Sequence, residues 1–195
     1  EVRVVDDSRL NYFTTEYYAQ AVTQVVKAND PNVVLFGATS IGRDLAPRLS
    51  ARLHTGLTAD CTKLEMDEEG NLFMTRPAFG GNTIATIACP DNRPQMATVR
   101  PGVMQKLAPV AGRKAEVIEY NPGFTQDSRW VEILEVVKAV GHVENIMDAK
   151  VLVSGGRGVG SKENFAMLQE LADVMGGMVS CSRAVVENGW LAPDY

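Results

Sequence analysis

The sequence is poor in the residues that bind most metals. Its 195 residues include two histidines and three cysteines, and no two cysteines are close enough to form a C-x-x-C pair. Widely spaced cysteines make a poor zinc site and a poor disulfide framework, and they suit a reducing compartment. The histidines, His54 and His142, stand alone in the sequence. We therefore expect no metal site.

The sequence also lacks an excess of positive charge and any long apolar run. Its 19 Lys and Arg residues against 24 Asp and Glu residues give a net charge of -5, which argues against nucleic-acid binding. We find no apolar run of membrane-spanning length and no signal peptide. With 45% hydrophobic and 22% charged residues, the chain can bury a core and is not disordered.

The first quarter alternates between strand and helix patterns. Val2–Asp7 and the apolar stretch 32–40 (NVVLFGATS) are predicted strands, and residues 14–29 and 41–53 have helical apolar spacing. Thr14 or Thr15 is the expected N-cap of the first helix and Ser40 that of the second, while Pro47 should kink or restart the second helix. This alternation favours a parallel sheet with helices on both faces.

The middle of the chain has a different character. Short alternating runs from Cys61 to Val99, with a turn at 69–71, predict an antiparallel addition to the sheet, and residues 95–100 and 115–120 are further short strands. A helix is expected over residues 127–141. The pattern then starts again with a strand over 149–154, a helix over Lys162–Met175 and a strand over 178–182. We therefore divide the chain into an N-terminal α/β domain, residues 1–141, and the beginning of a second α/β domain, residues 142–195.

A glycine-rich turn joins the strand over 149–154 to the next helix. In the segment VLVSGGRGVGSKENF (151–165), Gly155, Gly156 and Gly158 surround Arg157. Glycines let a backbone approach a ligand closely, although the spacing is only a loose relative of G-x-G-x-x-G. The segment is either a tight turn with a solvated arginine or an anion site, because the guanidinium suits phosphate or a ring that becomes anionic.

A second arginine follows the next strand. Ser182 and Arg183 stand at the end of the strand over 178–182, and a helix cap with a surface charge would account for both. If the two strands are adjacent and parallel, however, Arg157 and Arg183 lie at the same carboxyl edge, where ligands bind in open α/β sheets. Two cations at that edge indicate an anionic partner.

These motifs carry a family resemblance. The SGGRG turn with the following ENF, and the element SRAVVENGW, resemble the alpha subunit of electron transfer flavoproteins in order and spacing. The stretch VVLFGATSIGRDLAPRLSARLHTGLTADCT and the short motifs RPAFGGN and RPGVM resemble the first domain of the same family. The resemblance covers nearly the whole chain, and the motifs are specific when taken together.

The resemblance implies a heterodimeric electron carrier. Its FAD would be held mostly by the second domain, and the N-terminal domain would contact a beta subunit. The electrons would come from dehydrogenases such as the acyl-CoA dehydrogenases of fatty acid beta-oxidation. Arg183 would stand beside the flavin ring, where a cation stabilises the reduced, anionic flavin, with Ser182 as its neighbour. Arg157 would face the flavin region, and Gly155, Gly156 and Gly158 would allow the approach. The resemblance assigns no catalytic residue, because the cofactor carries the electrons.

The chain also departs from the family pattern. Members continue beyond the position of Tyr195 with Gln-Thr-Gly and Gly-Ile-Ser-Gly-Ala segments that supply much of the FAD contact, and they begin with a further strand and helix. We therefore expect a fragment that binds FAD weakly or not at all by itself. The expected location is the cytoplasm of a bacterium, or the mitochondrial matrix if the source is eukaryotic.

Two other functions remain open from the residues alone. The glycine turn could serve a nicotinamide- or CoA-dependent α/β enzyme, although no acidic residue lies about twenty positions beyond it, as NAD binding would favour. The first domain could also be a non-redox interaction domain. The turn Gly37-Ala38-Thr39-Ser40 is better explained as a helix cap than as a nucleotide site.

Overall fold

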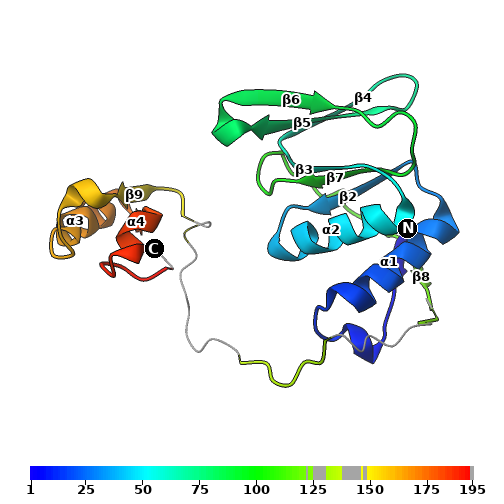
Figure 1. The fold of residues 1–195 in the computed structure, drawn as a ribbon, viewed down its shortest axis with the longest axis horizontal. Coiled ribbons are helices and arrows are strands. Elements are labelled where there is room, and N and C mark those ends of the chain that lie inside the picture. The colour runs from blue at the N-terminus through cyan, green and yellow to red at the C-terminus, as the bar shows by residue number, and fades with distance from the viewer. Residues whose placement is uncertain (122, 125–130, 138–145, 147–148, 194–195) are drawn as a thin grey trace. The chain divides into compact units, whose positions relative to one another are not determined.

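The computed structural model divides the chain into two compact units, residues 1–134 and 135–195 (Figure 1). It describes residues 1–121, 123–124, 131–137, 146 and 149–193. The predicted domain boundary between residues 141 and 142 lies outside the described residues and stays a prediction. We therefore treat each unit by itself.

A three-stranded parallel sheet forms the centre of the first unit. Its strands are β2 (Val33–Gly37), β7 (Gln95–Val99) and β3 (Leu57–Cys61), in that order, and both neighbours pair parallel to β7. The predicted α/β class with parallel strands is confirmed. Antiparallel pairing had been expected for 95–100, but this stretch is instead the middle strand of the parallel sheet. The polar side chains of Gln95 and Thr98 concealed that burial, since both are at most 1% exposed.

Two helices cover one face of this sheet. They are α1 (Thr15–Asn29) and α2 (Ser40–Leu53), and Ala19, Leu45 and Leu49 pack with Met96 of β7. Helix α2 is capped by Thr39, whose hydroxyl accepts a hydrogen bond from the Gly42 amide at 3.2 Å. It begins at Ser40, one residue after its cap, and continues through Pro47 to Leu53.

An antiparallel sheet covers the opposite face. Its strands are β4 (Lys63–Met66), β5 (Leu72–Ala78) and β6 (Thr83–Ile87), and Leu72 and Met74 pack with Cys61 and Ala97. Figure 1 shows the three layers, with β4–β6 above the parallel sheet and the helices below. The antiparallel addition is confirmed, but among the described residues it occupies the face where further helices had been expected.

One buried side chain joins the two sheets. The Gln95 Oε1 atom accepts a hydrogen bond from the Leu72 amide at 2.7 Å, and its Nε2 atom donates to the Gly70 carbonyl at 2.9 Å. Gln95 is 0% exposed and Leu72 is buried, so the first bond gives a partner to a buried backbone donor. The Gly70 carbonyl also accepts a hydrogen bond from the Asn32 side chain, at 3.1 Å.

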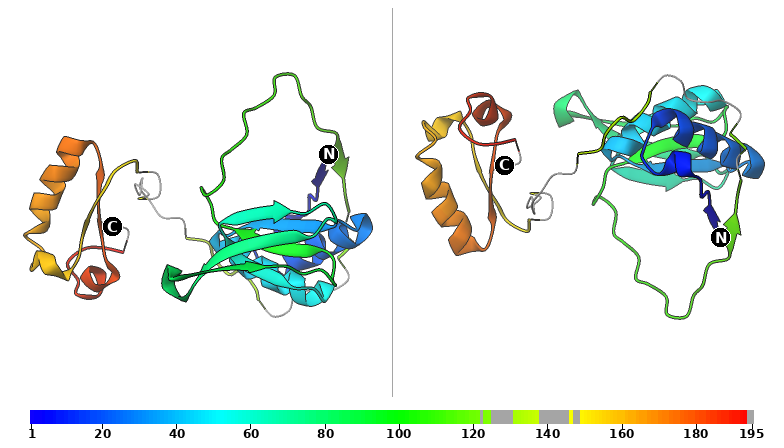
Figure 2. Two further views of the ribbon diagram at one scale, coloured as in Figure 1. Left: turned by 90° about the horizontal axis from the view of Figure 1, so that it is seen from above. Right: turned by 90° about the horizontal axis from the view of Figure 1, so that it is seen from below.

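The remainder of the first unit is less regular. Strands β1 (Val2–Val4) and β8 (Val117–Glu119) form a separate parallel pair. Figure 2 shows the segment between β7 and β8 as a long loop that extends away from the sheets. Short 3₁₀ turns occur at η1 (Ser8–Leu10) and η2 (Phe79–Gly81).

The helix predicted over residues 127–141 is wrong for the part that the structure describes. Residues 131–137 have no helical structure, and Leu134 and Val137 are 87% and 82% exposed. A short helix needs a packing partner for its apolar face, and within the described part of the chain Leu134 and Val137 are left largely exposed. The rest of the predicted helix, with Trp130, lies outside the described residues.

The second unit is a small α/β structure. Strands β9 (Leu152–Gly155) and β10 (Met178–Cys181) pair parallel to one another. A 3₁₀ turn, η4 (Arg157–Val159), leads to α3 (Phe165–Met175), and α4 (Arg183–Glu187) follows β10. The buried core consists of Val153, Phe165, Ala172, Val179 and Val185. Gly176, with a φ of 63°, follows the last residue of α3 as the predicted stop. The predicted order of strand, helix and strand is confirmed, although α3 begins at Phe165 and not at Lys162.

Candidate functional site

The pairing of β9 with β10 brings the two predicted arginine elements to one edge. Gly155 is the register partner of Cys181, and the Ser182 amide donates a hydrogen bond to the Gly155 carbonyl at 3.0 Å. Each arginine then lies two residues beyond a paired position, because Arg157 follows Gly155 as Arg183 follows Cys181. The expected placement of both at the carboxyl edge of parallel strands is confirmed.

The glycine turn is held by its own backbone. The Val159 amide donates to the Gly156 carbonyl at 3.0 Å and the Gly160 amide to the Arg157 carbonyl at 3.1 Å. The Asn164 side chain donates to the Val159 carbonyl at 2.7 Å. The Arg157 side chain is exposed and has no ion pair or hydrogen bond with any residue that the structure describes. Its guanidinium is therefore available to a ligand.

The three glycines of the turn have different surroundings. A Cβ atom on Gly155 would lie 2.6 Å from carbons of both Phe165 and Leu168, so this glycine is required for packing of β9 against α3. A Cβ on Gly156 would meet the Ser182 hydroxyl at 3.7 Å. A Cβ on Gly158 would meet nothing within 4 Å. Open space beside the arginine therefore exists at Gly158 and not at Gly155.

Arg183 differs from Arg157 in having a partner. Its side chain is 91% exposed, and its Nε atom donates to the Glu187 Oε1 atom at 2.8 Å. Ser182 occupies the N-cap position of α4, with φ -76° and ψ 153°, and its side chain makes no capping hydrogen bond. Glu187 is not among the predicted site residues, although its spacing of four residues from Arg183 is one at which side chains on a helix can pair.

Titratable groups near the turn do not form a catalytic set. The pKa of the Cys181 thiol is raised by burial, so the nucleophilic thiolate is disfavoured. A hydrogen bond from Ser161 keeps the pKa of Glu163 below its ordinary value. The edge therefore offers positive charge and hydrogen-bond donors and no activated nucleophile among these groups.

The corresponding edge of the first unit is satisfied internally. Asp60, near the end of β3, accepts two hydrogen bonds from Arg100, at 3.1 and 2.6 Å, and these bonds lower the pKa of Asp60. At the end of β2, a Cβ on Gly42 would lie 1.9 Å from the Gly37 carbonyl oxygen, so helix and strand meet closely there. The turn Gly37-Ala38-Thr39-Ser40 is thus a helix cap, as expected.

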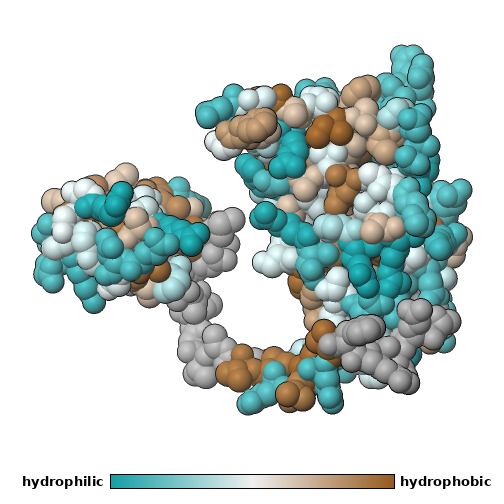
Figure 3. Space-filling view, in the orientation of Figure 1, coloured by the Kyte–Doolittle hydropathy of each residue, from teal (hydrophilic) through white to brown (hydrophobic). Residues whose placement is uncertain are grey.

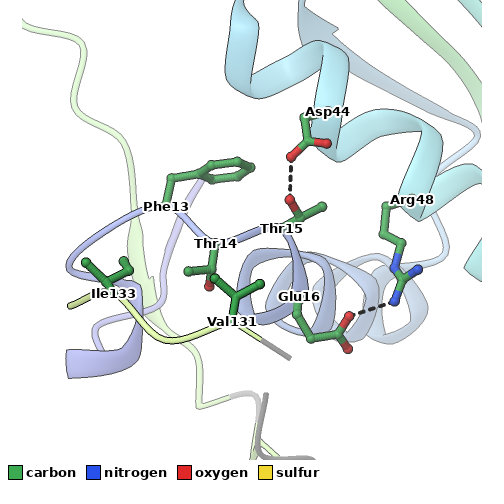
Figure 4. A pocket seen from close by; sticks show the side chains of 8 residues that line it. All are labelled: Phe13, Thr14, Thr15, Glu16, Asp44, Arg48, Val131 and Ile133. Carbon is green, nitrogen blue, oxygen red and sulfur yellow. Dashed lines mark hydrogen bonds and ion pairs between the residues drawn. The ribbon is translucent and has the colours of Figure 1, made fainter. Parts of the chain in front are cut away.

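A pocket of about 590 Å³ lies beside the start of α1 (Figure 4). Its charged groups already have partners. Asp44 accepts a hydrogen bond from the Thr15 hydroxyl, and Glu16 is bound by Arg48, which also lines the pocket, and by Arg52, which does not. Burial acts to raise the pKa of Glu16, but the two arginines outweigh it and keep that pKa below its ordinary value. We interpret the pocket as part of the contact between α1 and α2.

No three histidine, cysteine, aspartate or glutamate side chains of the described residues gather as a metal site would require. In the same residues we find no helix with the length and apolar character needed to cross a membrane.

Two family models match the chain. Residues 1–124 match the electron transfer flavoprotein domain, and residues 145–195 match the electron transfer flavoprotein FAD-binding domain.

Curated proteins match over the whole chain. The electron transfer flavoprotein subunit alpha of Thermoanaerobacterium thermosaccharolyticum is 50% identical over 194 residues, which are 100% of this chain and 59% of that protein. Protein FixB of Clostridium saccharobutylicum is 50% identical, over 100% of this chain and 58% of that protein. The acryloyl-CoA reductase electron transfer subunit beta of Anaerotignum propionicum is 40% identical, over 100% and 61%.

The chain thus spans about six tenths of the length of these relatives. One matched model lies in each unit, and the second model covers the paired strands β9 and β10 with their two arginines. On these grounds the chain belongs to the electron transfer flavoprotein family.

Proposed function

We propose that the chain is part of the alpha subunit of a heterodimeric electron transfer flavoprotein, which carries electrons on bound FAD. The observation that most directly supports this proposal is the match of residues 145–195 to the family's FAD-binding domain. These residues lie in the unit that presents two arginines at one edge of its strands. The named relatives come from bacteria, which supports a cytoplasmic location.

The residues present fit an anionic cofactor such as FAD. Arg157 offers a guanidinium without a protein partner in the described structure, and Gly158 leaves space beside it. Rigid guanidinium forks suit phosphate and other anionic groups. When bound, FAD would supply the electron-accepting chemistry. The contribution of the chain is to bind and orient that group and to surround it with positive charge.

Each site residue then has a separate task. Arg183 would place positive charge beside the flavin ring, with Ser182 next to it at the end of β10. Arg157 would approach from the turn after β9, beside the open space at Gly158, and Gly156 would lie next to the Ser182 hydroxyl. Gly155 would act indirectly, because its missing side chain lets β9 pack against α3.

The first unit would bind the beta subunit. The turn and second strand of the β5–β6 hairpin expose large apolar side chains, Phe79 at 84% and Ile84 at 73%. Figure 3 shows apolar residues at this free end of the hairpin. Exposed apolar groups that gather on one element are typical of protein interfaces. The relative named as a subunit alpha supports a beta subunit as the partner.

The electron donors are a finer part of the proposal. We propose dehydrogenases of the acyl-CoA dehydrogenase type, as the family resemblance implies. Relatives named FixB and acryloyl-CoA reductase electron transfer subunit show that family members carry other assignments as well. Fatty acid beta-oxidation is therefore one candidate pathway for this chain.

Flavin content tests the proposed function. The full-length subunit, purified with its beta subunit, should show the flavin absorption bands and contain one FAD at this site. Arg157→Ala should lower the affinity for FAD, whereas Arg113→Ala, which removes an exposed charge from the first unit, should not. The 195-residue chain alone should bind FAD weakly. A full-length protein without flavin, and without uptake of added FAD, would overturn the proposal.

A further inference from the structure

The ion pair between Arg183 and Glu187 is poorly explained as a device that stabilises α4. Both partners are largely exposed, at 91% and 61% of their side chains, and exposed pairs of this kind contribute little. The order of charges is also unfavourable, because the cation stands at the first residue of the helix and the anion at the last. The opposite order would suit the helix dipole.

The geometry of the pair does suit the presentation of Arg183 to a ligand. Glu187 Oε1 accepts from the Nε atom of Arg183 at 2.8 Å. This contact uses one of the five N–H donors of the guanidinium, and it leaves both terminal nitrogens for another acceptor. It also restrains a long side chain that solvent would otherwise leave free among many rotamers.

The two arginines of the edge therefore differ in how far a neighbouring anion offsets their positive charge. Among the described residues Arg157 has no carboxylate partner, whereas Arg183 is compensated by Glu187. A ligand at this edge would meet one uncompensated cation and one cation whose field is reduced by a neighbouring anion. Because charge interactions weaken with distance, that reduction depends on how closely Glu187 accompanies Arg183.

We propose that Glu187 is a positioning residue that holds Arg183 and sets the strength of its positive charge at the cofactor. This inference rests on the proposed function, since it requires FAD beside Arg183. Glu187 would orient the guanidinium through Nε and would make one-electron reduction of bound FAD less favourable than Arg183 alone would make it.

Glu187→Gln separates the two effects in the FAD-loaded, full-length heterodimer. Glutamine keeps an acceptor oxygen for Nε and removes the negative charge. We expect the equilibrium constant for the first one-electron reduction to rise about tenfold, which corresponds to about 59 mV for a one-electron couple. Glu187→Asp, which keeps the charge, should shift the potential less. Glu170→Gln removes an exposed charge from α3 and is the matched control, with no expected shift.

Arg183→Ala, measured in the same titration, distinguishes failure of the inference from failure of the proposed function. If Arg183→Ala lowers the potential and Glu187→Gln leaves it unchanged, the role of Glu187 is overturned and that of Arg183 stands. If neither variant shifts the potential while FAD stays bound, the proposed role of Arg183 falls, and the inference with it.

The contact can also be tested without cofactor. In the 195-residue chain, the Nε–H resonance of Arg183 should shift in the ¹⁵N NMR spectrum of Glu187→Ala and stay in place in Glu170→Gln. An unchanged Arg183 resonance in Glu187→Ala would show that the pair does not form in solution, and it would overturn the inference.

Discussion

The Ser182 amide and the Gly155 carbonyl are joined by a 3.0 Å hydrogen bond that extends the pairing of β9 and β10 by one step. Because of this bond, the two segments of the chain stay paired to the end of β9 and β10 and diverge only beyond it. Arg157 and Arg183 follow at once, one in a 3₁₀ turn and one in a helix. The relation between the two arginines is therefore set by backbone pairing and does not depend on long side chains meeting each other.

Replacement of glycines in the turn should separate packing from ligand access. Gly155→Ala forces a methyl group to within 2.6 Å of Phe165 and Leu168, and overpacking of this kind costs about 1–3 kcal/mol. Gly158→Ala adds its methyl to open space, so the midpoint of urea denaturation should hardly change. Equal losses of stability in the two variants would contradict this account of the turn.

The same pair of variants has a second readout in the full-length protein. Gly158→Ala should weaken FAD binding although it leaves stability intact, because the space beside Arg157 is then partly filled. Undiminished FAD affinity in Gly158→Ala would show that the cofactor does not approach the turn there.

Acid should remove the contribution of Glu16 to the stability of the first unit. Arg48 and Arg52 hold the folded-state pKa of Glu16 below its ordinary value of 4.5. A depressed folded-state pKa contributes stability above the unfolded-state pKa and loses it as the pH falls through the folded value. Glu16→Gln should therefore cost roughly 1 kcal/mol near pH 7, and the difference from wild type should shrink below about pH 4.5.

Urea denaturation at pH 7 and pH 3 measures this difference. The control is Glu65→Gln, which breaks an exposed pair with Lys63 and should cost less at pH 7, because exposed ion pairs contribute little. A Glu16→Gln deficit of the same size at both pH values would show that the carboxylate charge is not responsible.

Arg183 should be replaceable by lysine only in part. In the FAD-loaded heterodimer, Arg183→Ala should lower the potential of the first one-electron reduction, since a nearby cation favours the more negative form of the cofactor. Arg183→Lys should recover some of this loss, because lysine keeps the charge and lacks the planar fork. Spectroelectrochemical titration gives both values, and full recovery by lysine would indicate that charge alone matters.

The apolar end of the β5–β6 hairpin should be needed for assembly and not for folding. Phe79→Ser and Ile84→Ser alter side chains that are 84% and 73% exposed, so thermal stability of the chain should change little. Both variants should weaken association with the beta subunit in sedimentation or co-purification. Leu107→Ser, at an equally exposed position in the loop, is the control. Wild-type association of Phe79→Ser and Ile84→Ser would move the interface elsewhere.

The sequence predicted the second unit well because its signals are local. Gly176 follows the apolar spacing of α3 directly, and the pairing of neighbouring parallel strands fixes where Arg157 and Arg183 lie. The strand pairing of the first unit depends on distant residues. Nothing near Gln95 in sequence reveals that it bonds to Leu72 and Gly70, so its strand was predicted to belong to the antiparallel addition and not to the middle of the parallel sheet.

The candidate site shows the same limit. Residue type was enough to select the arginines, and the family motif assigned their roles. Residue type was not enough to tell which glycine serves packing and which leaves space for a ligand, since only the positions of Phe165 and Leu168 show that Gly155 serves packing. Glu187 was overlooked because its four-residue spacing from Arg183 indicates a possible ion pair but does not reveal, until the contact is seen, that the glutamate lies beside the candidate site.

The buried Gln95 bridge affects how the first unit opens. If the two sheets were held together by apolar contact alone, one sheet could detach while the other stayed folded. Detachment of β5 would leave the Gln95 amide without its bonds to Leu72 and Gly70, which ties the two sheets into one cooperative unit. In native-state hydrogen exchange, the Leu72 amide should then be protected to the same degree as the amides of β7, and both should exchange through the same opening.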